Sequence, residues 1–156
     1  NPVRDDGTGV AVNVSGTWSA RRIVMQAHRF KVLFADPESD WHRTTATLLE
    51  PHGIEAVAVG TGREALNRLE TGEIHVAVLD QHLPQLSGLQ VVKLLRESES
   101  APPAILLARD YSNQLLHEAL VMRVFSVLAK PVDVNLLLST LARVMQRKYA
   151  GRWPAV

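Results

Sequence analysis

The chain has 156 residues, of which 46% are apolar and 21% charged, and its net charge is +1. This length suits a single domain with a core of its own. A net charge so close to zero gives no electrostatic footprint for nucleic acid or for an anionic membrane, so we expect neither as a direct partner. The absence of cysteine excludes disulfides and thiolate metal sites, and it favours a reducing, cytoplasmic setting.

The first 30 residues lack the regular pattern of the rest of the chain. They begin at Asn1 without an initiator methionine, which leaves open that the chain is a fragment of a larger protein. Glycine-containing turns are followed by a basic stretch, 18–30, that predicts a short helix. We interpret residues 1–30 as an N-terminal extension of unknown role, 31–148 as the domain and 149–156 as a short C-terminal tail.

Apolar runs alternate with helical patterns from residue 31 onward. The predicted strands cover 32–35, 54–59, 74–79, 104–108 and 124–128. The predicted helices begin with one capped by Ser39 or Asp40 and continue with 63–70, 89–96, 113–122 and 133–148. Strands that are apolar on both faces and alternate with helices are typical of a parallel sheet covered on both sides. The sequence therefore predicts a three-layer, doubly wound α/β fold with five parallel strands and five helices.

Three polar residues stand at the ends of predicted strands. Asp36 follows the first strand, Asp80 the third and Lys130 the fifth. Because the ligand crevice of an open parallel sheet lies beyond the carboxyl ends of its strands, we expect these side chains to share one pocket. A pair of carboxylates needs a cation to offset its repulsion, and its oxygens suit Mg²⁺. A carboxylate beside such cations can attack a phosphoryl group, so the pocket suits phosphate chemistry.

Three motifs at these strand ends together point to a family. The segment 78–89, VLDQHLPQLSGL, resembles the phosphoacceptor segment D-x-x-(M/L)-P-x-(M/L)-(S/D)-G of response-regulator receiver domains. Ala108-Arg109-Asp110 and Leu128-Ala129-Lys130-Pro131 resemble the segments that follow the fourth and fifth strands of the same family. The resemblance extends from about residue 31 to residue 148, with the order and spacing of the motifs intact.

The resemblance implies a flavodoxin-like sheet with strand order 2-1-3-4-5 and a signalling role in a two-component phosphorelay. Asp80 would accept a phosphoryl group from a histidine kinase or phosphotransfer protein, and Lys130 would contact the phosphoryl oxygens. Mg²⁺ would be held by Asp36, Asp80 and the backbone carbonyl of His82, with Glu38 as a further candidate. The bond between Lys130 and Pro131 would be cis, an isomer that few X-Pro bonds adopt.

The same resemblance implies the kinds of partner and activity. The domain would signal through contacts with a downstream protein or with another domain of a parent chain, and a homodimer is left open. It would not be an enzyme, beyond assisting its own phosphotransfer and dephosphorylation.

Three positions depart from the family pattern. Pro37 stands where a second acid is usual, which weakens the expected Mg²⁺ site or removes it. We align the switch hydroxyl of the fourth strand with Leu107 and the switch aromatic of the fifth strand with Val127. These degenerate switch positions support an alternative, a pseudo-receiver that binds a protein partner independently of phosphorylation. A third hypothesis is a small-ligand-binding domain of the same fold.

Some polar and apolar residues have simpler interpretations. Lys130 could form an ion pair with either acid whether or not phosphorylation occurs, and His82 could be a surface histidine without a role. Leu115, Leu116, Leu120 and Val121 are interpreted as core and helix face. The basic residues near the C-terminus, Arg143, Arg147, Lys148 and Arg152, favour a solvated helix end rather than a binding site.

Overall fold

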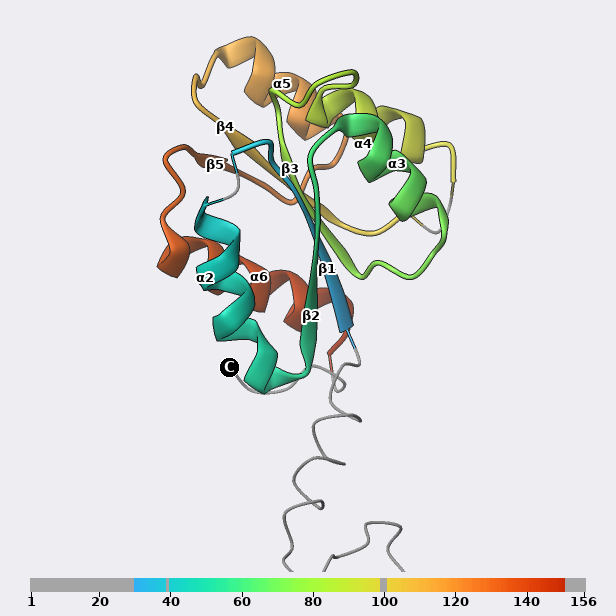
Figure 1. The fold of residues 1–156 in the computed structure, drawn as a ribbon. Helices are drawn as coiled ribbons and strands as arrows, with labels where there is room; N and C mark the ends of the chain where they lie inside the picture. Colours follow the sequence, from blue (N-terminus) through green and yellow to red (C-terminus); the bar gives the residue numbers. More distant parts are fainter. Residues whose placement is uncertain (1–29, 39, 99–100, 151–156) are drawn as a thin grey trace, which may run out of the picture.

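The structure is a computed structural model that describes residues 30–38, 40–98 and 101–150. Its five strands are β1 (Phe30–Ala35), β2 (Ile54–Val59), β3 (Val76–Asp80), β4 (Ala104–Ala108) and β5 (Ser126–Ala129). All neighbouring strands are parallel, and their order in the sheet is β2-β1-β3-β4-β5. The predicted doubly wound sheet is confirmed, with all carboxyl ends at one edge (Figure 1). The helix predicted at 18–30 lies outside the described residues except for Phe30, which opens β1.

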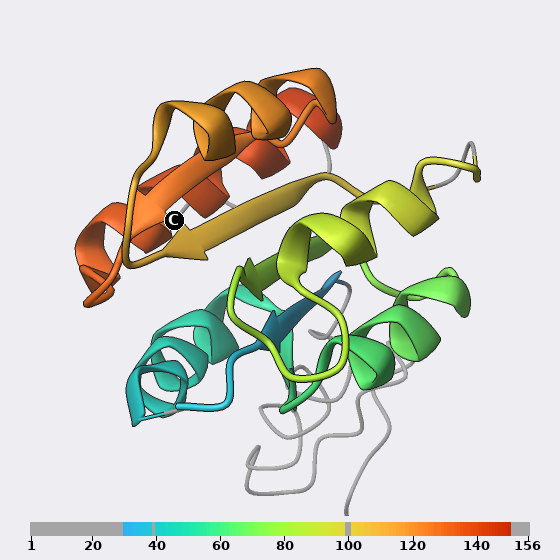
Figure 2. The same ribbon diagram turned by 90° about the horizontal axis from the view of Figure 1, so that it is seen from above.

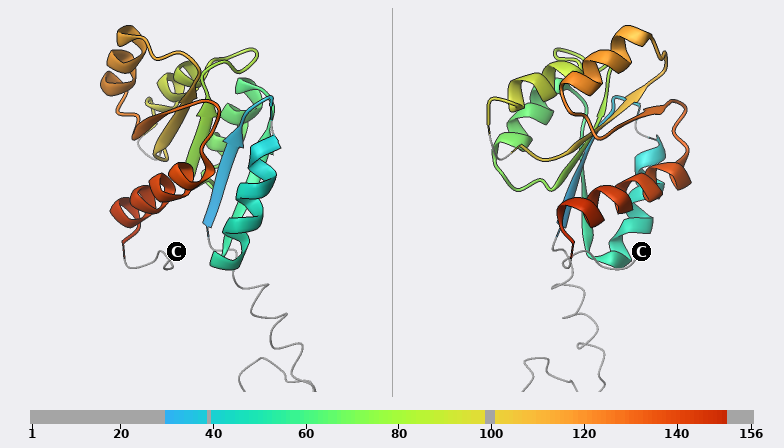
Figure 3. Two further views of the ribbon diagram at one scale, coloured as in Figure 1. Left: turned by 90° about the vertical axis from the view of Figure 1, so that its left-hand side faces the viewer. Right: turned by 180° about the vertical axis from the view of Figure 1, so that it is seen from behind.

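The described helices are α2 (Asp40–Leu49), α3 (Gly62–Glu70), α4 (Gly88–Leu95), α5 (Asn113–Val121) and α6 (Val134–Lys148), and a short 3-10 helix (Glu50–His52) follows α2. Helices α2 and α6 lie side by side on one face of the sheet, and α3, α4 and α5 cover the other (Figures 1 to 3). This is the predicted three-layer arrangement. In the described part of the chain, every helix is too short or too polar to cross a membrane.

Side-chain caps begin most of these helices. Ser87 forms a capping box with Gln90 at α4, and Thr61 and Ser112 each accept a hydrogen bond from a backbone amide of α3 and α5. Asp133 does the same at α6. Such caps satisfy amides that have no partner inside the helix. Helix α2 begins at Asp40, whereas Ser39, the other predicted cap, lies outside the described residues.

The sheet separates two hydrophobic cores because successive side chains of a strand point to opposite faces. Phe34, Val78 and Leu107 lie in the core under α2 and α6. Leu33 and Leu79 lie in the core under α3, α4 and α5. The central strands β1 and β3 are therefore buried on both faces, which fixes the positions of the residues at their carboxyl ends.

The interpretation of α5 needs a correction. Leu115 is buried, but Leu116 is 38%, Leu120 75% and Val121 57% exposed. Helix α5 is only nine residues long, and its buried stripe consists of Leu115 and Ala119. Leu116, Leu120 and Val121 lie outside this stripe and face away from the sheet. Helix α5 thus carries an exposed apolar surface.

The predicted tail begins with a residue that belongs to the packing of the domain. The Tyr149 ring lies against Phe30 and His75, with ring centroids 5.8 and 5.4 Å apart. The Tyr149 hydroxyl donates a hydrogen bond to the backbone carbonyl of His75 at 2.9 Å. These contacts lie at the amino end of the sheet, opposite the strand-end acids.

Candidate functional site

The strand ends bring Asp36, Asp80 and Lys130 together. Lys130 Nζ lies 2.8 Å from Asp80 Oδ2 and 3.1 Å from Asp36 Oδ2. Asp36 and Asp80 are both 3% exposed. Each follows or ends a central strand whose apolar side chains anchor it on both faces, so the carboxylates have little freedom to move apart. The pocket predicted from the sequence is present at the carboxyl edge of the sheet.

The ammonium of Lys130 is the cation that allows two carboxylates to share this site. Burial alone would lower the pKa of Lys130, but its hydrogen bonds to Asp80 and Asp36 outweigh that effect and raise the pKa above its ordinary value. Lys130 is therefore charged at neutral pH. One positive charge then faces two negative charges in a buried setting, where charges interact strongly.

The two carboxylates differ in how many hydrogen bonds they accept. Asp36 Oδ1 accepts from the backbone amide of Glu38 at 2.8 Å and from Lys130, and Asp36 Oδ2 accepts from the indole Nε1 of Trp41 at 2.7 Å and from Lys130. A carboxylate oxygen has two lone pairs, so the described donors saturate Asp36.

Asp80 keeps acceptor capacity. Its Oδ1 accepts from the backbone amide of His82 at 3.0 Å, and its Oδ2 accepts from Lys130. Each oxygen thus has one donor among the described residues and one lone pair left. Asp36 is therefore the more fully hydrogen-bonded of the two side chains, and Asp80 keeps acceptor capacity on both oxygens.

An ion pair between Arg109 and Glu38 borders the site. Hydrogen bonding to Arg109 lowers the pKa of Glu38, and Glu38 in turn raises the pKa of Arg109. Both side chains are more than half exposed. They line a pocket of about 530 Å³ together with Asp80, and Glu38 also lies 3.4 Å from Lys130. The Arg109 guanidinium therefore lies on the open side of Asp80, as a second cation beside the Lys130 ammonium.

Sequence reasoning missed the parts played by Trp41 and Arg109. The helical pattern after Asp40 includes Trp41, but such a pattern does not indicate a partner for the indole N–H. A buried or half-buried tryptophan usually finds an acceptor for this group, and Trp41 lies five residues after Asp36. Arg109 directly follows β4, so its place at the carboxyl edge was available from the strand prediction.

The predicted magnesium ligands fit an ion poorly as they are arranged. Pro37 supplies no side-chain ligand, and the Glu38 carboxylate is bound to Arg109 and Lys130. Since the lone pairs of Asp36 are already used, an ion at this carboxylate would have to displace Trp41 or Lys130. Within the ranges that the structure describes, no three His, Asp or Glu side chains converge as a metal cluster.

The structure does not bring Leu107 and Val127 together. Leu107 is fully buried in the core under α2 and α6, whereas Val127 packs on the opposite core. In the register of β4 and β5, Val127 pairs with Leu106 and Ala129 pairs with Ala108. Ala108, the last residue of β4, alternates onto the face of Val127, and neither Leu107 nor Ala108 carries a hydroxyl.

Tyr111 connects the loop after β4 to β5. Its hydroxyl donates a hydrogen bond to the Val127 carbonyl at 2.6 Å. Burial raises the pKa of Tyr111. Tyr111 thus joins the loop that carries Arg109 to β5, the strand that directly precedes Lys130.

The loop after Asp80 is held by close backbone contacts. The Gly62 amide donates a hydrogen bond to the Pro84 carbonyl at 3.0 Å, and Gln85 adopts a positive φ of 74°. Gly88 approaches the Asp80 carbonyl so closely that a Cβ there would lie 2.9 Å from it. The Lys130–Pro131 peptide bond at the other side of the site is cis. The contacts of Gly62 and Gly88 hold the loop that follows Asp80 and carries His82.

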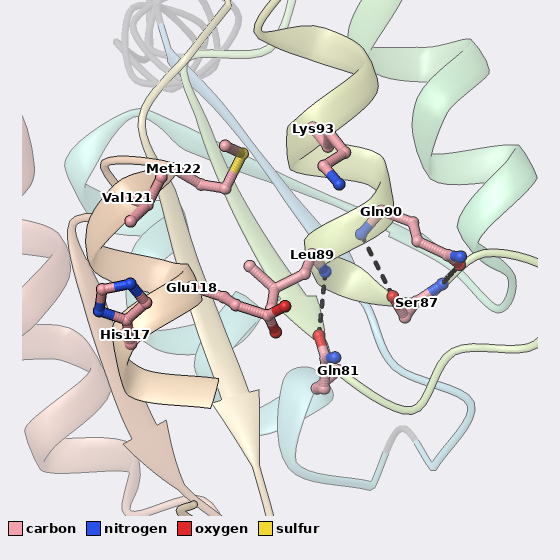
Figure 4. Close-up of a pocket in the computed structure, with 9 residues that line it drawn as sticks. All are labelled: Gln81, Ser87, Leu89, Gln90, Lys93, His117, Glu118, Val121 and Met122. Carbon is pink, nitrogen blue, oxygen red and sulfur yellow. Dashed lines mark hydrogen bonds between the residues drawn. The ribbon is translucent and has the colours of Figure 1, made fainter. Parts of the chain in front are cut away.

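A separate pocket lies between α4 and α5 (Figure 4). Its floor includes Gln81, whose side-chain oxygen accepts a hydrogen bond from the Leu89 amide at 2.9 Å. Ser87 and Gln90 form the capping box at its side. Each of these polar groups supports the start of α4, so we interpret the pocket as structural.

The strand order and the three strand-end residues are those of a receiver-type α/β domain. Residues 32–142 match the family described as the response regulator receiver domain, and the chain belongs to this family. Receiver domains are signalling domains and generally bind Mg²⁺ at their acidic site.

Named relatives agree with this assignment. Over 118 residues the chain is 30% identical to the CAI-1 autoinducer sensor kinase/phosphatase CqsS of Vibrio cholerae, which covers 74% of this chain and 17% of that protein. Over 116 residues it is 31% identical to the sensory transduction protein RegX3 of Mycolicibacterium smegmatis, which covers 74% of this chain and 50% of that protein. The chain therefore spans half or less of the length of these two relatives.

Solved structures show the same fold. The receiver domain of the Francisella response regulator 1452 superposes with a TM-score of 0.68 and 28% identity, covering 76% of this chain and 98% of that chain. The chemotaxis protein CheY4 of Vibrio cholerae superposes with a TM-score of 0.66 and 27% identity, covering 74% and 98%.

Proposed function

We propose that this domain accepts a phosphoryl group on Asp80 from a phosphohistidine of a histidine kinase or phosphotransfer protein, and signals through protein contacts. The observation that supports this most is the difference between the two carboxylates. Asp80 has a lone pair on each oxygen and faces an open pocket, whereas Asp36 is saturated by hydrogen bonds. The likeness to a protein named as a sensor kinase/phosphatase supports a phosphohistidine donor.

The transfer would use the groups around Asp80 in defined ways. An Asp80 oxygen attacks phosphorus, the P–O bond forms as the P–N bond to imidazole breaks, and the leaving nitrogen takes up a proton. Lys130 donates to the carboxylate before transfer and to the phosphoryl oxygens after it, offsetting the charge that builds on them. The His82 amide holds Asp80 in position through its hydrogen bond to Oδ1.

Magnesium is expected to bind this domain weakly. Receiver domains generally hold the ion at the acidic site, but here Pro37 offers no side-chain oxygen next to Asp36. Mg²⁺ requires near-octahedral oxygen ligands and gives up its waters reluctantly, so loss of one carboxylate ligand weakens the site.

Mass spectrometry of the intact protein tests the proposal directly. The wild type, incubated with phosphoramidate or acetyl phosphate, should gain one phosphoryl group, and Asp80→Asn should gain none. Asp110→Asn is the matched control because Asp110 lines the same pocket without contacting Lys130. The proposal fails if the wild type gains no phosphoryl group under any of these conditions, or if Asp80→Asn gains one.

A second candidate is a phosphorylation-independent interaction module. It is favoured by the exposed apolar residues of α5, Leu116, Leu120 and Val121. It is also favoured by Leu107 and Val127, which offer neither a hydroxyl nor an aromatic ring. In this case, binding of a protein partner should be unchanged in Asp80→Ala and lost in Leu120→Ser. A large loss of affinity in Asp80→Ala, measured with the same partner by titration calorimetry, would count against the module.

A further inference from the structure

Asp36, one of the predicted metal ligands, accepts a hydrogen bond from Trp41. The Trp41 ring lies at the start of α2, edge-on to Phe34 with ring centroids 5.3 Å apart, and its Nε1 donates to Asp36 Oδ2 at 2.7 Å. The packing against Phe34 fixes the direction of the N–H group. The indole therefore takes a lone pair of Asp36 that would otherwise point toward a cation.

Lys130 competes for the space between the two carboxylates. Its Nζ contacts an oxygen of Asp36 at 3.1 Å and an oxygen of Asp80 at 2.8 Å, with a side chain that is only 7% exposed. An ion bridging the same carboxylates would stand close to this ammonium, and two cations repel strongly in a buried site. The Lys130 ammonium thus already offsets negative charge of the two carboxylates that a divalent ion would otherwise offset.

Arg109 supplies a second cation on the side where a phosphoryl group would arrive. It borders the pocket that contains Asp80 and also the neighbouring pocket that contains Trp41 and Lys130. Its present partner is Glu38, whose side chain is 62% exposed. A phosphoryl group on Asp80 carries more charge than one carboxylate and offers Arg109 the planar, two-oxygen contact that guanidinium prefers.

We propose that this site works with Lys130 and Arg109 in place of a divalent ion, and that Trp41 keeps the ion out by saturating Asp36. The role of Arg109 rests on the proposed phosphorylation of Asp80. Exclusion of the ion does not, because it depends only on the hydrogen bonds of the unmodified site.

Metal binding tests the exclusion without any phosphorylation. Mg²⁺ is titrated into the wild type, into Trp41→Phe and into Trp18→Phe, a control that removes a tryptophan elsewhere in the chain, and heat is measured by calorimetry. Trp41→Phe keeps a ring against Phe34 but frees one lone pair of Asp36, so its affinity should exceed that of the wild type and the control by about tenfold or more. Equal affinities in all three proteins overturn the proposal.

The wild type alone provides a second test if Trp41→Phe does not fold. Backbone and indole signals are followed by NMR during addition of Mn²⁺, whose unpaired electrons broaden nearby signals. Signals of Trp41, His82 and Lys130 should broaden no more than those of surface residues. Selective broadening around Asp36 and Asp80 at stoichiometric Mn²⁺ overturns the exclusion.

The dependence of phosphorylation on metal tests the two cations. The rate of adduct formation with phosphoramidate should be the same within about twofold in EDTA and in excess Mg²⁺, because no step needs the ion. Arg109→Ala should lower the rate about tenfold or more in both, and the control Arg68→Ala, an exposed arginine at the far end of α3, should not. A strong dependence on Mg²⁺, or an unchanged rate in Arg109→Ala, overturns the proposal. If no protein forms an adduct, the proposed function fails, and the metal titrations still decide the exclusion.

Discussion

Lys130 Nζ donates a hydrogen bond to Asp80 Oδ2 at 2.8 Å, and both side chains are more than nine-tenths buried. The two residues are 50 positions apart in the chain, and the pair forms only when β3 and β5 take their places on either side of β4. Lys130 also contacts Asp36, so one side chain joins the ends of three strands.

Lys130→Met should destabilise the domain substantially. The variant leaves two buried carboxylates without their cation, and losing one partner of a buried ion pair costs about 3–5 kcal/mol. Lys93→Met, which changes an exposed lysine of α4, should stay within about 0.5 kcal/mol of the wild type. Urea denaturation at pH 7 measures both. A loss below about 1 kcal/mol in Lys130→Met would contradict the role given to this ammonium.

The contribution of Lys130 should depend on pH in one direction. Its pKa in the folded state is raised above the ordinary value, chiefly by Asp80 and Asp36 acting against its burial. A raised lysine pKa gives stability that is fully present below the unfolded-state pKa of about 10.4 and is lost as the pH rises through the folded-state value. The difference in unfolding free energy between wild type and Lys130→Met should thus be flat from neutral pH to about pH 10 and shrink above it. A difference that already shrinks between neutral pH and about pH 9 would exclude this explanation.

Gly62→Ala should be far more harmful than Gly60→Ala. A Cβ at Gly62 would lie 2.0 Å from the Leu86 carbonyl oxygen, whereas a Cβ at Gly60 meets nothing within 4 Å. The first change forces α3 away from the loop after Asp80, at a cost of about 1–3 kcal/mol or more. The second should be close to neutral, and thermal unfolding compares them. Equal melting temperatures would show that the loop adjusts without cost.

Tyr111→Phe should weaken the connection between the loop after β4 and β5. The Val127 carbonyl loses its hydrogen bond from the Tyr111 hydroxyl, which costs about 0.5–1.5 kcal/mol. Because burial raises the pKa of Tyr111, its stabilising effect is present below a pH of about 10 and is lost as the phenol ionises at higher pH. Amide hydrogen exchange of β5 should increase in the variant at neutral pH. Unchanged exchange would show that the hydrogen bond from Tyr111 does not stabilise β5.

The fold and the three central site residues could be predicted because they follow from patterns along the chain. Apolar runs end at Asp36 and at Asp80, and parallel strands place their carboxyl ends at one edge. Trp41 packs against the core under α2 and α6, as a residue on the inner side of a helix does, but helix periodicity describes the direction of a side chain and not the partner of its N–H group. Arg109 has a long side chain whose position depends on Glu38, 71 residues earlier, and no local pattern carries that information.

At the end of β4, a shift of one residue changes the face of the sheet to which a side chain points. Leu107 and Ala108 are neighbours, yet their side chains point to opposite faces of the sheet. From the sequence alone, either residue can be aligned with the family's hydroxyl position. The register places Ala108 opposite Ala129 and on the face of Val127, and neither Leu107 nor Ala108 carries a hydroxyl.

The contact of Tyr149 with Phe30 has a consequence for how the domain can be connected to others. The two rings lie 5.8 Å apart at the end of the sheet opposite Asp80. The start of β1 and the end of α6 therefore lie close together, at the end of the sheet opposite its carboxyl edge. A domain with adjacent attachment points can be inserted into, or added to, a longer polypeptide without stretching its sheet.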